Sequence, residues 1–134
     1  MPDAHWVIDS SALLAHLHNE PGAERVEDAL GNGAAISAAN LAEVLSKLAD
    51  AGDEPADVLE GLRRQGTLNA LEVIPLTADD TVGLANVREK TRMFGLSLGD
   101  RACLSLAQRL RLPALTADRT WLRLRLGIRV ESIR

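Results

Sequence analysis

The sequence predicts an α/β fold in which a central parallel sheet is covered by helices on both faces. Two observations predict it. Short apolar segments of strand length alternate with longer segments of helical spacing along all 134 residues, as is typical of parallel sheets. Hydrophobic content of 46% and charged content of 25% are those of a soluble globular protein, and a length of 134 residues predicts a single domain spanning 1–134.

The first part of the chain predicts two strands and three helices. The apolar run "WVI" predicts a strand at 5–9, and apolar residues at helical spacing then predict helices at 11–18 and 22–30. The turn "GNG" precedes "AAIS", which predicts a short strand at 34–37. A wide apolar arc predicts a helix at 39–51 that is covered on two sides.

The middle of the chain repeats this alternation. The turn signal "AGDEP" precedes a helical segment at 55–66. The apolar run "LEVIPL" predicts a strand at 71–76. Two helices are then expected, at 78–92 and 98–110.

The last part of the chain contains two strand candidates. "PALTA" predicts a buried strand at 113–117, followed by a short helix at 119–126 and a final strand at 128–133. Sites in parallel sheets gather beyond the carboxyl ends of the strands, where the strand order reverses. A functional residue is therefore expected directly after a strand.

Charge is distributed unevenly over the chain. Residues 1–87 carry 4 basic and 15 acidic side chains, whereas residues 88–134 carry 11 basic and 4 acidic ones. The Arg-rich C-terminal third fits a surface that faces a polyanion. The same charge distribution fits equally well a folded protein in which the acidic and the Arg-rich parts of the chain intermix on an ordinary surface.

Other bulk features concern the compartment. The lone Cys103 excludes an internal disulfide and suits a reducing compartment, so a cytoplasmic location is expected. No apolar run approaches the ~20 residues that a membrane span needs. The N-terminus lacks a basic region followed by an apolar run, so no signal peptide is expected.

Four acids occupy positions where a site is expected. Asp9 ends the first strand, Glu43 lies one turn into the helix after the second strand, Asp100 begins a helix and Asp118 follows the fourth strand. Asp9 and Asp118 could instead cap helices. The Ser10 and Ser11 hydroxyls can bond the first amides of the helix, which would leave the Asp9 carboxylate free.

The other two acids also have structural alternatives. Glu43 could pair with Lys47 on a helix surface, and Asp100 could form a capping box with Ser97. Taken together, the positions favour a shared site, because carboxylates brought close together must be protonated or neutralised by a cation. A set of oxygen ligands without His or Cys favours Mg²⁺, with Mn²⁺ as a further candidate. Such ions activate water for in-line phosphoryl displacement.

At this point the sequence resembles a known family. The segments "VIDSSALLA", "NLAEVLSKL", "LSLGDRACLSLA" and "ALTADRTW" look like those of the PIN-domain ribonucleases, specifically the VapC-type toxins of bacterial toxin–antitoxin pairs. The resemblance spans essentially the whole chain. It implies a PIN-like three-layer sandwich whose parallel sheet has the order 3-2-1-4-5, with strands one and four adjacent at the reversal.

The resemblance also implies roles for particular residues. Asp9 and Asp100 match direct metal ligands most securely, and Ser10 and Thr116 match positions where the family often carries a hydroxyl near the metals or the scissile phosphate. The complete acidic site, catalytic and metal-binding, is implied to be Asp9, Glu43, Asp100 and Asp118.

Arginines close to these acids are candidates for substrate binding. Arg101 could hold a carboxylate in place or contact a phosphate. Arg119, together with Arg123 and Arg125, follows the last acid and is a candidate for phosphate contact.

The resulting hypothesis is a metal-dependent endoribonuclease that acts as the toxin of a toxin–antitoxin pair. The family implies RNA as substrate, a small antitoxin that covers the acidic cleft and a homodimer built from apolar helices. The alternative is a PIN-like module that binds RNA or a partner without cutting. The four acids argue against this alternative, because carboxylates repel phosphate.

Overall fold

The computed structural model describes residues 3–134 and confirms the predicted α/β architecture. In this part of the chain a five-stranded, all-parallel sheet has the order β3-β2-β1-β4-β5. This is the order that the resemblance implied. The strands are β1 (Trp6–Ile8), β2 (Ala34–Ser37), β3 (Leu71–Ile74), β4 (Ala114–Thr116) and β5 (Val130–Ser132).

Helices connect the strands. Within residues 3–134 there are seven α-helices and two 3-10 helices. They are α1 (Ser10–Leu17), α2 (Ala23–Asn32), α3 (Ala38–Asp50), α4 (Pro55–Arg64), α5 (Thr67–Ala70), α6 (Asp80–Lys90), η1 (Arg92–Phe94), α7 (Leu98–Leu110) and η2 (Arg119–Arg123).

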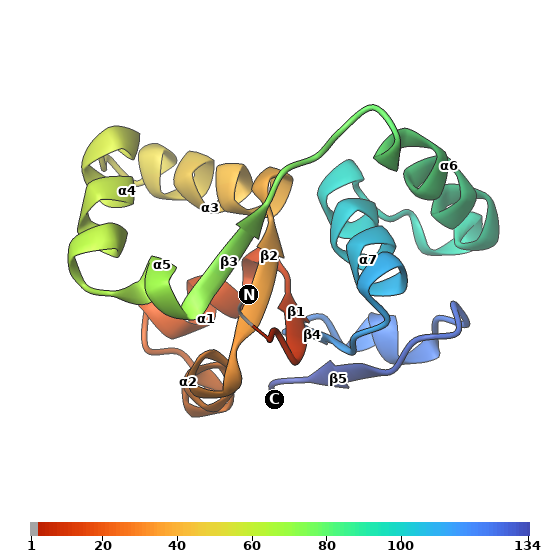
Figure 1. Ribbon diagram of the computed structural model, residues 1–134, viewed down its shortest axis with the longest axis horizontal. Coiled ribbons are helices and arrows are strands. Elements are labelled where there is room, and N and C mark those ends of the chain that lie inside the picture. The colour runs from red at the N-terminus through yellow and green to blue at the C-terminus, as the bar shows by residue number, and fades with distance from the viewer. Residues whose placement is uncertain (1–2) are drawn as a thin grey trace.

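The helices form a layer on each face of the sheet. Helices α1 to α5 cover one face, and α6, α7, η1 and η2 cover the other (Figure 1). Successive strand residues point to opposite faces, so Ile8 packs into the core under α1 to α4 and Val7 into the core under α7 and Trp121. Both cores are built mainly from Leu, Val, Ile and Ala, as the scarcity of aromatic residues requires.

The structure differs from the sequence prediction in three places: two short helices were not predicted, and one expected α-helix is a 3-10 helix. The expected helix 55–66 ends at Arg64, because Gly66 adopts the left-handed conformation (φ 79°) and the separate helix α5 follows it. The turn η1 was not predicted, and the expected α-helix 119–126 is the 3-10 helix η2. The bounds of the remaining elements differ from the prediction by two residues at most.

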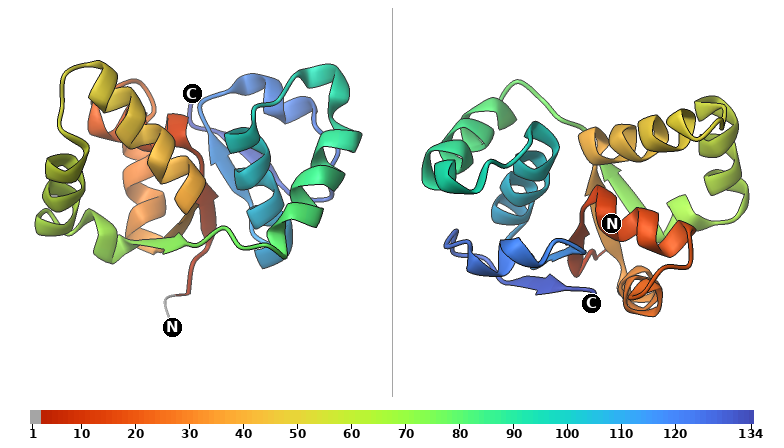
Figure 2. Two further views of the ribbon diagram at one scale, coloured as in Figure 1. Left: turned by 90° about the horizontal axis from the view of Figure 1, so that it is seen from above. Right: turned by 180° about the vertical axis from the view of Figure 1, so that it is seen from behind.

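The topology places one end of the sheet between two helices. β1 pairs with β2 on one side and β4 on the other, so the strand order reverses beside β1. β1 ends between α3 and α7 (Figure 2). Among residues 3–134 no helix combines the length and apolar character that crossing a membrane would demand.

Candidate active site

Asp9 lies at the switch point, directly after β1. Its backbone is extended, and its Oδ1 accepts a hydrogen bond from the Ala12 backbone N–H (2.8 Å), so it caps α1. The Thr116 hydroxyl donates to Oδ2 (2.6 Å) and the Ser11 hydroxyl donates to Oδ1 (2.8 Å). The expectation that Ser10 and Ser11 cap the helix and free this carboxylate is therefore wrong: Asp9 itself reaches the helix-start amide.

The environment of Asp9 disfavours its charge. Burial, with a smaller contribution from the nearby charge of Asp100, raises the pKa of Asp9 from 3.8 to about 6. The hydrogen bonds from Thr116, Ala12 and Ser11 act in the opposite direction and do not offset the burial. A cation beside Asp9 would stabilise the charged form.

Glu43 enters the site from α3 and is half-buried. Its Oε1 accepts hydrogen bonds from the Ser10 hydroxyl (2.6 Å) and from the Asn40 side-chain amide (3.2 Å). Among the described residues it forms no ion pair with Lys47. The surface-pair alternative for Glu43 is therefore wrong.

Two residues that sequence reasoning did not assign position Glu43. Asn40 is buried, and its amide also donates to the Gly99 carbonyl (3.0 Å), which joins α3 to α7. Gly99 leaves room for the acid, since a Cβ there would collide with both carboxylate oxygens of Glu43. The spacing of Asn40 and Glu43, three residues apart on one helix face, was the available signal for Asn40.

Asp100 lies at the start of α7 and forms the capping box that its spacing from Ser97 predicts. The Ser97 N–H donates to Asp100 Oδ2 (3.0 Å), and the Asp100 N–H donates to the Ser97 hydroxyl (3.1 Å). Burial raises the pKa of the Cys103 thiol well above its usual value, and the charges of Asp9, Asp100 and Glu43 raise it further. These three carboxylates therefore all lie near enough to Cys103, in the second turn of α7, for their charges to act on its thiol.

Asp118 is placed differently. Its backbone N–H donates to the Thr116 hydroxyl (3.0 Å), which connects it to Asp9 through Thr116. Its exposed carboxylate accepts from the Thr120 N–H (2.9 Å) and hydroxyl (2.7 Å) and so caps η2. The structure brings Asp118 to the same end of the sheet but turns its carboxylate toward Thr120.

Among the described residues, none of the four arginines near the acids forms an ion pair with them. Arg101 Nη1 donates to the Leu84 carbonyl of α6 (3.4 Å), and within residues 3–134 this side chain forms no ion pair. Holding a carboxylate is therefore not the role of Arg101 in this structure. Arg119 donates to the Arg134 carbonyl (2.7 Å), and Arg123 and Arg125 are exposed.

The donor set fits a hard divalent cation by its chemistry. Carboxylate and hydroxyl oxygens dominate the site, and Asp9 and Asp100 raise one another's energy when both are charged. In residues 3–134 no three potential ligand side chains converge closely enough to hold an ion as they stand. The hydrogen bonds from Ser10 and Asn40 both go to Oε1 of Glu43.

Fold and site together define a parallel α/β protein with carboxylates at the switch point of its sheet. The family model of the PIN domain matches residues 6–126, so the chain belongs to the PIN-domain family. A comparison with curated proteins found no match.

Solved structures share the fold over nearly the whole chain. A toxin–antitoxin complex from Klebsiella pneumoniae has a TM-score of 0.69 at 20% identity and covers 96% of this chain and 97% of the other. VapBC2 from Rickettsia felis, bound to promoter DNA, has a TM-score of 0.70 at 19% identity, and the match covers 95% of this chain and 97% of the VapBC2 chain. VapC20 of Mycobacterium tuberculosis, a toxin that cleaves the sarcin–ricin loop, has a TM-score of 0.69 at 16% identity. The match covers 92% of this chain and 98% of the VapC20 chain.

Proposed function

We propose that this chain is a Mg²⁺- or Mn²⁺-dependent endoribonuclease that acts as the toxin of a toxin–antitoxin pair. The observation that carries the proposal is the set of hydrogen bonds that joins the end of β1 to α3 and α7. Ser10, next to Asp9, donates to Glu43, and Asn40 donates to the carbonyl of Gly99, next to Asp100. The pKa of Asp9 is raised to about 6, mainly by burial and least by Asp100. Membership of the PIN family supports the nuclease assignment. Burying carboxylates without a counter-charge destabilises the folded chain, and a cation would offset that cost.

The residues of this chain have distinct tasks in the proposed site. Asp9, Glu43 and Asp100 would hold the cation, with Asp118 completing the site from the edge. Thr116 and Ser11 hold the Asp9 carboxylate in place, and Asn40 and Ser10 hold that of Glu43. The cation would supply an activated water and neutralise charge that develops on the phosphodiester oxygens during in-line displacement.

The partner assignments rest on the solved structures. The neighbours from Klebsiella pneumoniae and Rickettsia felis are toxin–antitoxin assemblies, which supports a small antitoxin as partner of this chain. A cytoplasmic location and a homodimer belong to the same proposal. The apolar arc of α3 gives the homodimer little support, because Leu41, Val44 and Leu48 are already buried in the chain's own core.

A cleavage assay tests the nuclease assignment. We expect purified protein to cut a structured RNA in Mg²⁺ or Mn²⁺ and to stop cutting in EDTA. Asp9→Asn should abolish cleavage while circular dichroism shows an intact fold, because the substitution removes a ligand charge and keeps the side-chain shape. Binding of RNA without cutting by the wild type would instead support a PIN-like binding module.

A further inference from the structure

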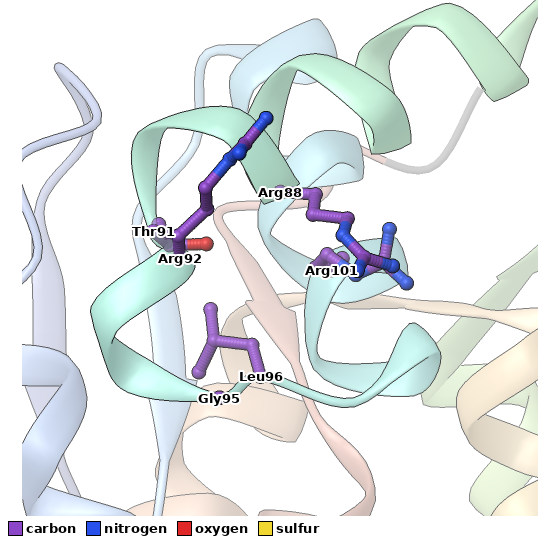
Figure 3. Close-up of a pocket in the computed structure, with 6 residues that line it drawn as sticks. All are labelled: Arg88, Thr91, Arg92, Gly95, Leu96 and Arg101. Atoms are coloured by element: carbon purple, nitrogen blue, oxygen red, sulfur yellow. The ribbon is translucent and has the colours of Figure 1, made fainter.

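A pocket of about 470 Å³ lies between α6, η1 and the start of α7, outside the acidic site. Figure 3 shows its lining, in which Arg88 and Arg101 extend to the same side of the pocket and Arg92 rises from η1. Three of the lining side chains are guanidinium groups, and no carboxylate is among the lining residues of the described chain. The lining residues are Arg88, Thr91, Arg92, Gly95, Leu96 and Arg101.

The three arginines of this pocket are not neutralised by the protein. In residues 3–134 none of them forms an ion pair, whereas Arg25, Arg109 and Arg129 all pair with acids. The Arg101 guanidinium has five N–H donors but only one partner among the described residues, the Leu84 carbonyl at 3.4 Å. Its Nε is buried and has no hydrogen-bond partner there. Unpaired buried donors and clustered like charges are costly, and an anion would reduce both costs.

The position of the pocket favours one kind of anion. Arg101 directly follows Asp100 on α7, so one wall of the pocket begins at the residue next to this acid, with the Arg101 side chain turned toward α6. A nucleic-acid strand carries a phosphate at every nucleotide, so a strand with one phosphodiester at the acids presents further phosphates beside it. Guanidinium groups bind phosphate oxygens through two parallel hydrogen bonds. They would also offset the repulsion between the carboxylates of the site and a polyanion.

We propose that Arg88, Arg92 and Arg101 form a phosphate subsite that binds the RNA backbone next to the cleaved bond. This inference rests on the proposed function. An acidic peptide would fit the charge of the pocket but would not require its position beside Asp100.

RNA binding in a background that does not cut tests the subsite. Asp9→Asn protein is compared with the same protein carrying Arg88→Gln and Arg92→Gln, using a fluorescein-labelled 20-nucleotide single-stranded RNA and anisotropy at several NaCl concentrations. We expect Kd at low salt to rise about tenfold. We expect the slope of log K against log salt to shrink by about 0.7 for each phosphate that the arginines no longer neutralise.

A matched control uses arginines at the other end of the molecule. Arg63→Gln with Arg64→Gln removes the same charge from exposed positions on α4, and we expect Kd and slope close to those of the Asp9→Asn parent. The single variant Arg92→Gln alters only an exposed side chain and repeats the test if the double variant fails to fold.

The outcomes separate the subsite from the proposed function. Unchanged Kd and unchanged salt slope in the Arg88/Arg92 variant would overturn the subsite even if the wild type cleaves RNA. If the Arg88/Arg92 variant lost binding to a labelled decaglutamate peptide but still bound RNA like its parent, the RNA subsite would be overturned in favour of a site for an acidic protein partner. Arginine-dependent RNA binding in a protein that never cleaves would support the subsite and refute the nuclease assignment.

Discussion

Asp9 as a single residue combines two tasks. It caps α1 through Ala12, and it holds a buried carboxylate at the point where the sheet order reverses. Thr116 and Ser11 fix its orientation without neutralising it, so its pKa stays at about 6. Residues that bind a cation must be charged in the folded protein, and the cost of that charge should be measurable.

The stability of the cation-free protein should therefore depend on the ionisation of Asp9. From about pH 4 to about pH 6 the folded protein retains a proton on Asp9 that the unfolded chain has lost. The free energy of unfolding should thus fall as pH rises through this window, by up to about 3 kcal/mol. In EDTA, Asp9→Asn should be more stable than wild type at pH 7.5, and the difference should shrink toward pH 4. Urea unfolding at each pH measures this.

Asp118 provides the control for this measurement. Its carboxylate is exposed and caps η2, a role that Asn also performs. Asp118→Asn should follow the pH dependence of wild type. If the free energies of unfolding of wild type and Asp9→Asn changed with pH in parallel, the charge of Asp9 would not destabilise the folded protein.

Among the secondary-structure elements, the junction of α3 with α7 positions Glu43. Gly99 lies in the first turn of α7, where its missing side chain makes room for the Glu43 carboxylate. Gly99→Ala should displace Glu43 and lower kcat about 10- to 100-fold. The free energy of unfolding should change by less than about 1 kcal/mol, because the gain in helix propensity offsets the weakened hydrogen bonds of Glu43. Steady-state cleavage and urea unfolding give the two values.

Gly61 in α4 is the matched control. A Cβ there meets nothing within 4 Å, so Gly61→Ala should gain about 0.5–1 kcal/mol and keep full activity. Equal activity of Gly99→Ala and Gly61→Ala would remove Glu43 from the proposed site.

The sequence predicted the elements that have a strong period or follow a clear turn signal, and missed those set by local geometry. The strand at 34–37 and the helix at 98–110 agree with β2 and α7 at both ends. Helix α5 has only four residues, too few to show a period, and it follows a left-handed Gly66. The positions of Asp9 and Asp118 followed from the strand ends, whereas the direction of each carboxylate depended on nearby donors such as Thr120 beside Asp118.

Across the molecule as a whole, the uneven charge has two outcomes. Folding joins the two parts of the chain through two ion pairs: Arg109–Asp80 (3.4 Å) neutralises an arginine of the Arg-rich third, and Arg25–Glu131 (3.1 Å) neutralises one of its few acids. Arg88, Arg92 and Arg101 stay unpaired within the described residues and line one pocket. In the proposed function, the acids at the sheet end and the arginines of this pocket would bind one polyanion together.

If the acids at the end of β1 form a cation site, Mn²⁺ should stabilise the folded protein, and thermal unfolding at increasing Mn²⁺ measures this. Binding to the folded state alone should raise the Tm of wild type, with a gain of about 2.7 kcal/mol when Mn²⁺ is 100-fold above its Kd. Asp100→Asn should blunt the rise, since Asn keeps the capping geometry but lacks the charge. An equal rise in wild type and Asp100→Asn, or no rise in wild type at millimolar Mn²⁺, would refute a cation site built on these acids.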